Sequence, residues 1–191
     1  DTDCAGECGG TSVEDDCGVC NGDGTSCQIA SLSLGAFDSS GSLEVLYDFG
    51  SEVGGFQFYV SGLDLTGASL GAAEDAGLVV STGANGVVLG FDALLTGASI
   101  PAGSGVLTVL EFSSVTAGET ELSLGNFGDV TDSLGNGFTE VVASGSVDHG
   151  DPDCAGDYYG LAQEDECGVC NGDGIADGAC DCDGNVTDCA G

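Results

Sequence analysis

The positions of the cysteines divide the chain into a cysteine-free centre and two cysteine-rich ends. All eleven cysteines lie in residues 4–27 or 154–189. Short segments of this kind bury too little apolar surface to form a core, so they usually depend on disulfides made in an oxidising compartment. We therefore expect disulfide-stapled ends and an extracellular protein. The stretch CGVC would also fit a zinc knuckle in a reducing cell, but the surrounding Asp, Asn and Gly residues favour disulfides and calcium.

The two ends are copies of one another. Residues 14–24 read EDDCGVCNGDG and residues 164–174 read EDECGVCNGDG, with ten of eleven positions identical at a spacing of 150. The match continues without a gap to residues 1 and 151. A duplication of this kind indicates one supersecondary unit used twice in the chain.

The duplicated sequence predicts that the chain has three segments and an even number of cysteines in each repeat. We expect a first cassette at 1–27, a central domain at 28–150 and a second cassette at 151–191. The second cassette runs into a further repeat, because 187–191 read TDCAG as 2–6 do. A period of 187 − 2 = 185 residues leaves ten cysteines that can all pair, and a chance match in a biased composition is the alternative. The disulfide candidates are Cys4, Cys8, Cys17, Cys20, Cys27, Cys154, Cys167, Cys170, Cys180 and Cys182.

The charge is entirely acidic. The chain has 33 Asp and Glu residues, no Lys or Arg and one His, for a formal net charge of −33. Self-repulsion of this size opposes compaction, and bound metal cations are the natural means of neutralising it. Nucleic acid and acidic membrane surfaces are excluded as partners because no side chain can neutralise phosphate. No apolar run is long enough for a transmembrane helix, so we expect no membrane insertion.

The cassettes carry the residue types of a calcium site. Ca²⁺ takes six to eight oxygen ligands, and D-x-D and N-x-D spacings can aim several side chains at one ion. No segment fits the EF-hand pattern, and for any one Asp the alternative is a solvated surface charge. We expect Ca²⁺ as the bound ion. The candidate ligands are Asp1, Asp3, Asp15, Asn21, Asp23, Asp151, Asp153, Asp165, Asn171, Asp173, Asp177, Asp181, Asp183, Asn185 and Asp188.

The cassette sequence resembles a known repeat family. The stretches DCAG and DxCGVCNGDG are similar to Asp- and Cys-rich repeats of secreted bacterial proteins and to thrombospondin type 3 repeats. That resemblance implies that calcium ions and disulfides replace a hydrophobic core. Tyr158 and Tyr159 depart from the pattern, because they stand where the first copy has Cys8 and Gly9. The two copies therefore cannot share every disulfide.

The central domain has the pattern of an all-β fold. In SLEVLYDF, alternation places Leu43, Val45, Tyr47 and Phe49 on one face. GFQFYV, GVVLGFDALL and GVLTVLEFSSV read as further strands separated by Gly- and Ser-rich turns. Eight or nine short strands without a convincing helix predict a two-sheet β-sandwich, with at most a helical turn at 72–77.

LEVLYDFGSEVGGFQFYVSG and VLGFDALLTGASIPAGSGVLTVLEF resemble the cohesin family and its carbohydrate-binding-module relatives. The resemblance implies a jelly-roll sandwich of the kind that binds dockerins, which are calcium-loaded modules. We expect Phe56 and Phe58 to face the core and Tyr59 to face outward. Without Trp, a sugar-stacking surface has little support, although glycans remain a candidate partner.

The residue inventory argues against an enzyme. His149 is the lone histidine and is expected at the surface of a domain boundary, and no nucleophile–base pair or metalloprotease motif is evident. Asn185 opens the sequon NVT and is a glycosylation candidate.

Two functions remain open. The first is a secreted structural repeat of a filament or stalk, in which calcium- and disulfide-stiffened joints separate sandwiches and the partners are copies of the chain itself. The alternative is a cohesin-like adhesion or scaffold module that recognises a calcium-loaded protein or a surface glycan.

Overall fold

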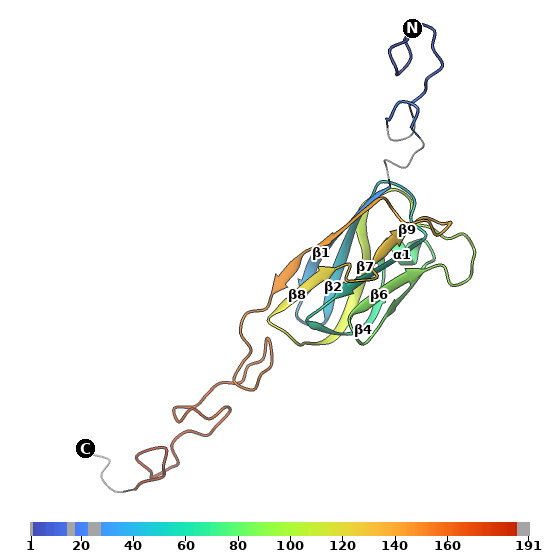
Figure 1. Ribbon diagram of the computed structural model, residues 1–191. Helices are drawn as coiled ribbons and strands as arrows, with labels where there is room; N and C mark the ends of the chain where they lie inside the picture. The colour runs from blue at the N-terminus through green and yellow to red at the C-terminus, as the bar shows by residue number, and fades with distance from the viewer. Residues whose placement is uncertain (1, 15–17, 23–27, 187–191) are drawn as a thin grey trace.

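The computed structural model describes residues 2–14, 18–22 and 28–186. Its centre is a β-sandwich, and the two cassettes extend from opposite ends of it as loop-rich segments (Figure 1). The fold class predicted from the alternating strands, an all-β sandwich flanked by loop-rich cassettes, is confirmed.

The first sheet has the strand order β10-β1-β2-β7-β4. Its strands are β1 (Ile29–Asp38), β2 (Ser42–Phe49), β4 (Leu63–Ser69), β7 (Gly103–Val115) and β10 (Glu140–Ser144). β1 pairs with β10 in parallel, and the other pairs are antiparallel. The parallel pair brings the last part of the domain alongside its first strand.

The second sheet has the strand order β11-β8-β3-β6-β5, and β9 also pairs with β3. Its strands are β3 (Gly55–Val60), β5 (Val79–Thr82), β6 (Val87–Phe91), β8 (Glu119–Ser123), β9 (Asp129–Thr131) and β11 (Ser146–Asp148). The short helix α1 (Gly71–Asp75) overlaps residues 72–77, where a helical turn was expected.

The core lies between the two sheets and follows the predicted alternation. Leu43, Val45 and Phe49 of β2 are fully buried, as are Phe56 and Phe58 of β3. Burying side chains of this size from both sheets supplies the main driving force for folding. The sandwich therefore needs nothing from the cassettes to form its core.

The chain crosses from one sheet to the other at Gly145. This residue separates β10 from β11 and has φ +137°, a value that L side chains rarely adopt. Its carbonyl accepts a hydrogen bond from the Leu122 amide at 3.0 Å. After the crossing, the chain runs through β11 to the end of the sandwich from which the second cassette extends (Figure 1).

Candidate functional site

The second cassette is organised around aspartate side chains that accept backbone amides. The Asp153 Oδ1 atom accepts from the Ala155 and Asp157 amides at 2.9 and 3.0 Å. Its Oδ2 atom accepts from the Ala162 amide at 2.9 Å. One carboxylate thus closes a loop of ten residues, which we call an Asp loop.

The same loop recurs at Asp165 and at Asp3. The acceptors and donors keep the same spacing: Oδ1 accepts from the second and fourth following residues, and Oδ2 accepts from the ninth. The donors are Cys167, Val169 and Gly174 for Asp165, and Ala5, Glu7 and Ser12 for Asp3. The repeat seen in the sequence is therefore a repeat of this hydrogen-bonded unit.

Two glycines in each loop explain the pattern D-x-x-G-x-x-x-G. The first, such as Gly156, has φ +92° and lets the chain turn back beneath the carboxylate. The second packs against the carboxylate: a Cβ at Gly160 or Gly172 would lie 2.1 Å from the Asp153 or Asp165 Oδ2 atom. No side chain fits at either of these second positions.

A variant of the loop uses asparagine. Asp181 Oδ1 accepts from the Asp183 and Asn185 amides, and Asp181 Oδ2 accepts from Asn185 Nδ2 at 2.6 Å. Asp132, in a turn of the sandwich, binds Asn136 in the same way. Asn185, the glycosylation candidate, therefore has a structural role through the nitrogen that a glycan would modify.

The Asp loops use most of the acceptor capacity of their carboxylates on backbone amides. Backbone N–H groups point at both oxygens of Asp3, Asp153 and Asp165, two at Oδ1 and one at Oδ2. These hydrogen bonds hold the pKa of each of the three carboxyls below its ordinary value. Within residues 2–14, 18–22 and 28–186, no three His, Cys, Asp or Glu side chains converge in a way that could hold a metal.

The other candidate calcium ligands are placed as follows. Asp151, Asp173, Asp177 and Asp183 are exposed and free to carry solvated charge. Asn21 and Asn171 adopt equivalent left-handed conformations, with φ +53° and +52°, and form turns of their cassettes. Asp1, Asp15, Asp23 and Asp188 lie outside the described residues. Calcium binding stays a prediction.

Disulfides tie the loops together. Cys4–Cys20 and Cys154–Cys170 are equivalent bonds in the two copies, and Cys167–Cys182 adds a second bond in the later one. Cys180 is also disulfide-bonded, whereas Cys17 and Cys27 lie outside the described residues.

The expectation that ten cysteines pair fails at Cys8, which is an exposed free thiol. Its counterpart in the second copy is Tyr158, so the equivalent disulfide of the two copies leaves this position out.

Tyr158 and Tyr159 connect the second cassette to the sandwich through His149. The Tyr159 hydroxyl lies 2.8 Å from His149 Nδ1, and Thr120 Oγ1 of β8 lies 2.8 Å from Nε2. His149 is only 7% exposed, so the prediction of a surface histidine was wrong. Tyr158 and Tyr159, which depart from the repeat, cover the imidazole, and sequence reasoning missed this contact.

Thr120 and His149 form a nucleophile–base pair that the sequence did not reveal. Thr120 is fully buried, and the ring of His149 lies between Thr120 and Tyr159. No substrate carbonyl can approach a hydroxyl in that position. The arrangement therefore serves packing and hydrogen bonding between the sandwich and the cassette.

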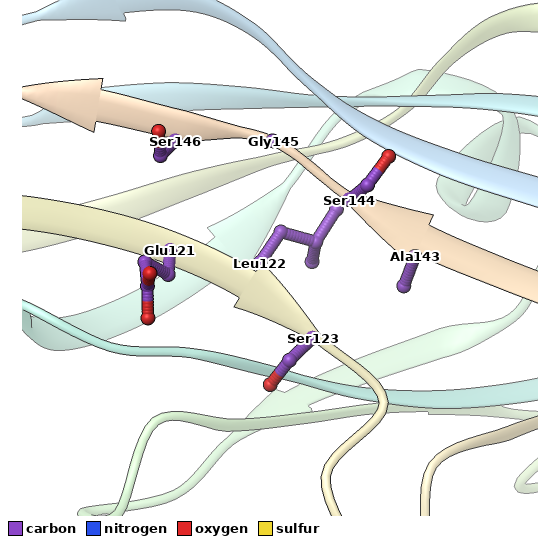
Figure 2. A pocket seen from close by; sticks show the side chains of 7 residues that line it. All are labelled: Glu121, Leu122, Ser123, Ala143, Ser144, Gly145 and Ser146. Atoms are coloured by element: carbon purple, nitrogen blue, oxygen red, sulfur yellow. The ribbon is translucent and has the colours of Figure 1, made fainter.

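A pocket of about 400 Å³ lies beside the crossing at Gly145. Figure 2 shows that Leu122 and Ala143 provide its apolar side chains and that serines and Glu121 surround them. It is wide open and lacks a pair of catalytic groups. Its form is that of a shallow groove at the edge between the two sheets.

The outer face of the second sheet is apolar for so acidic a chain. Val79, Leu89 and Phe91 are 47, 38 and 40% exposed, and Phe127 in the turn before β9 is 78% exposed. Gly55, Leu89, Phe91 and Thr131 line a small pocket of about 210 Å³ there, together with Asp129. The pocket on this face has one carboxylate, whereas the whole chain has 33 Asp and Glu residues. The face is therefore unusually apolar for this molecule.

No protein-family model and no curated protein matches the chain. Solved cohesin structures match its fold. CaCohA2 of Clostridium acetobutylicum, in a complex with CaDoc0917(R16D), is 19% identical at a TM-score of 0.46, covering 62% of this chain and 98% of its own. A non-cellulosomal cohesin of Archaeoglobus fulgidus is 16% identical (TM-score 0.43; 61% and 88% covered). A type III cohesin of Ruminococcus flavefaciens is 13% identical (0.40; 72% and 96%).

At these scores and identities the likeness concerns the β-sandwich and carries nothing about function. Among the described residues, no helix is long and apolar enough to cross a membrane.

Proposed function

We propose that this chain is an extracellular, non-catalytic spacer: a β-sandwich held between two stiffened cassettes, as a repeat unit of a filament or stalk. The observation that carries the proposal is the construction of the cassettes. In its described residues, each combines at least one Asp loop with at least one disulfide, and these fix a loop-rich chain without a hydrophobic core. Disulfides of this number also favour an oxidising, extracellular location.

The shape of the molecule also supports a spacer function. The cassettes extend from opposite ends of the sandwich, so the chain is long relative to its folded core (Figure 1). A chain joined end to end in this way separates its sandwiches at set intervals. Uniform negative charge adds to the extension, because like charges on neighbouring units repel each other.

Small-angle scattering of the purified chain, before and after reduction, tests the spacer function. An extended particle whose maximum dimension changes on reduction, while the cross-section of the sandwich persists, is the expected result. Electron microscopy of the native assembly then asks whether sandwiches recur at a constant spacing along a filament. The proposal would be contradicted if scattering showed a compact particle whose dimensions do not change on reduction, and if microscopy showed separate particles in the native material.

A second candidate function is recognition of a protein partner through the outer face of β3, β6 and β5. The exposed side chains of Leu89 and Phe91 and the scarcity of charge favour this use of the face. A dockerin-type module is the partner to try first. We expect Phe91→Asp to abolish its binding and Val142→Asp, a change of similar exposure on the other sheet, to leave binding intact. Equal binding by both variants would exclude the face.

A further inference from the structure

We propose that Tyr158 and Tyr159 lock the second cassette onto the end of the sandwich in one orientation, and that the Asp3 loop, which has Cys8 and Gly9 at the equivalent positions, lacks this lock. The joint between the sandwich and the second cassette would then be stiff. This inference goes beyond the spacer function, because it concerns the joint of a single chain and holds whether or not chains assemble.

The lock begins in the hydrophobic core. Phe112 of β7 is 7% exposed and stacks on Phe37 of β1, with ring centroids 5.5 Å apart. Phe37 in turn contacts the ring of His149 at 4.8 Å and the ring of Tyr159 at 5.9 Å. A continuous series of rings therefore leads from the sandwich into the cassette, and ring pairs at these separations are favourable.

Hydrogen bonds fix the histidine at the centre of the lock. The His149 amide donates to the Gly118 carbonyl, and its Nε2 atom meets the buried Thr120 hydroxyl. Its Nδ1 atom meets the Tyr159 hydroxyl, and Tyr158 packs edge-on against the ring at 6.4 Å. His149 is therefore held by the sandwich on one side and contacted by both tyrosines on the other.

The backbone of Tyr159 shows that this contact outweighs a conformational cost. Tyr159 has φ +60°, a region that bulky side chains rarely occupy. The equivalent residue of the first cassette is Gly9, with φ +71°, so the loop requires a left-handed residue at this position. Glycine would meet that requirement without strain, and a tyrosine persists there only if its side chain is stabilised elsewhere.

The cassette side of the joint is equally well fixed. Tyr158 and Tyr159 lie inside the Asp153 loop, between the Asp157 amide that donates to Asp153 and Gly160 that packs on the same carboxylate. The Cys154–Cys170 disulfide ties this loop to the rest of the cassette. In the first cassette, Cys8 and Gly9 offer no aromatic ring, so its Asp loop cannot make the same contacts.

The Tyr159→Gly variant of the full chain tests the lock. It installs the residue of the first copy, so the Asp153 loop and its disulfides are expected to form as before. The readout is the set of residual dipolar couplings of backbone amides in the sandwich and in the second cassette. One alignment tensor should describe both parts in the wild type, and two independent tensors should be needed in the variant. Leu161→Gly is the matched control, because Leu161 lies in the same loop and is 92% exposed.

Tyr159→Phe separates the two contributions of the tyrosine. It keeps the ring against Phe37 and removes only the hydroxyl at His149, so we expect an intermediate loss of coupling and a changed ¹⁵N shift at His149 Nδ1. A single alignment tensor in Tyr159→Gly, equal to that of Leu161→Gly, would overturn the proposal. That result would leave the spacer function standing, because scattering and microscopy test it independently.

Discussion

At the residue scale, aspartate side chains fix the conformation of the cassettes, a role that bound cations or hydrophobic cores have in other proteins. A single carboxylate collects three amide donors and so fixes a ten-residue loop, as Asp165 does with Cys167, Val169 and Gly174. Hydrogen bonds to a charged acceptor are stronger than neutral ones, which suits a loop that has little apolar surface to bury.

Gly172→Ala should open the Asp165 loop. A Cβ there would lie 2.1 Å from the carboxylate oxygen, so the carboxylate must move away from the Gly174 amide to which it is bonded. We expect hydrogen exchange at Val169 and Gly174 to accelerate roughly tenfold, about the effect of losing one hydrogen bond. Gly178→Ala is the control, because nothing lies within 4 Å of a Cβ at that position, while its φ of +86° adds a backbone strain that Gly172 does not have. Equal acceleration in both variants would show that the clash with the Asp165 carboxylate is not what opens the loop.

Acid should weaken the loops and the joint in separate pH ranges. Hydrogen bonds lower the pKa of Asp153 below 3.8 in the folded chain, so its contribution is complete above that pH and is lost as pH falls through the folded pKa. Burial lowers the pKa of His149 below 6.5, against the opposing effect of Asp148. The unfolded state takes up the histidine proton first, so stability begins to fall near pH 6.5.

Two tyrosines contact the ring of that histidine, Tyr158 and Tyr159, and two carboxylates lie next in sequence to residues that contact it: Glu119 beside Thr120 on β8 and Asp157 beside Tyr158 on the cassette. Chemical shifts of His149 and of the Ala155 and Asp157 amides, followed from pH 8 to 2, report the two steps. A His149 pKa at or above 6.5 would contradict this order.

At the element scale, the strands could be predicted well and the cassettes only in outline. Alternation of Phe56 and Phe58 with Gln57 follows directly from the pleat, so their burial was foreseen. The Asp loops were not, because D-x-D spacing suggests converging ligands as readily as it suggests carboxylates that bind their own backbone. The burial of His149 depends on Tyr159, a contact that local sequence patterns cannot specify.

Reduction of the disulfides should unfold the second cassette and leave the sandwich folded. The central domain contains no cysteine and buries its core between its own sheets, whereas the described cassette disulfides are all internal to a cassette. With excess reductant we expect loss of amide protection in the second cassette and an unchanged melting temperature of the sandwich. Phe58→Ala provides the converse change: it should destabilise the sandwich by about 3–5 kcal/mol in denaturant while the oxidised cassette keeps its protection. Loss of both parts together in either experiment would show that they fold as one unit.

At the scale of the whole molecule, the question is how a chain of net charge −33 stays folded without any Lys or Arg. The Asp loops neutralise part of that charge locally, since each carboxylate is met by the partial positive charge of amide hydrogens. The remaining exposed carboxylates repel one another over distances of about 10 Å at 0.1 M salt. Raising the ionic strength should therefore raise the melting temperature of the chain.

Calcium can be distinguished from this general screening by comparing ions at equal ionic strength. If the exposed carboxylates of the second cassette, such as Asp173 and Asp177, assemble a specific site, micromolar to millimolar Ca²⁺ should raise stability where Mg²⁺ does not, because the two ions differ in the ligand geometry they accept. If the cations act by screening alone, Ca²⁺ and Mg²⁺ should give the same melting curve. Amide protection at Ala155, Val169 and Gly174 should be unaffected by chelator in either case, because those donors bind carboxylates directly. Loss of that protection on chelation would show that calcium, and not the backbone, holds the Asp loops closed.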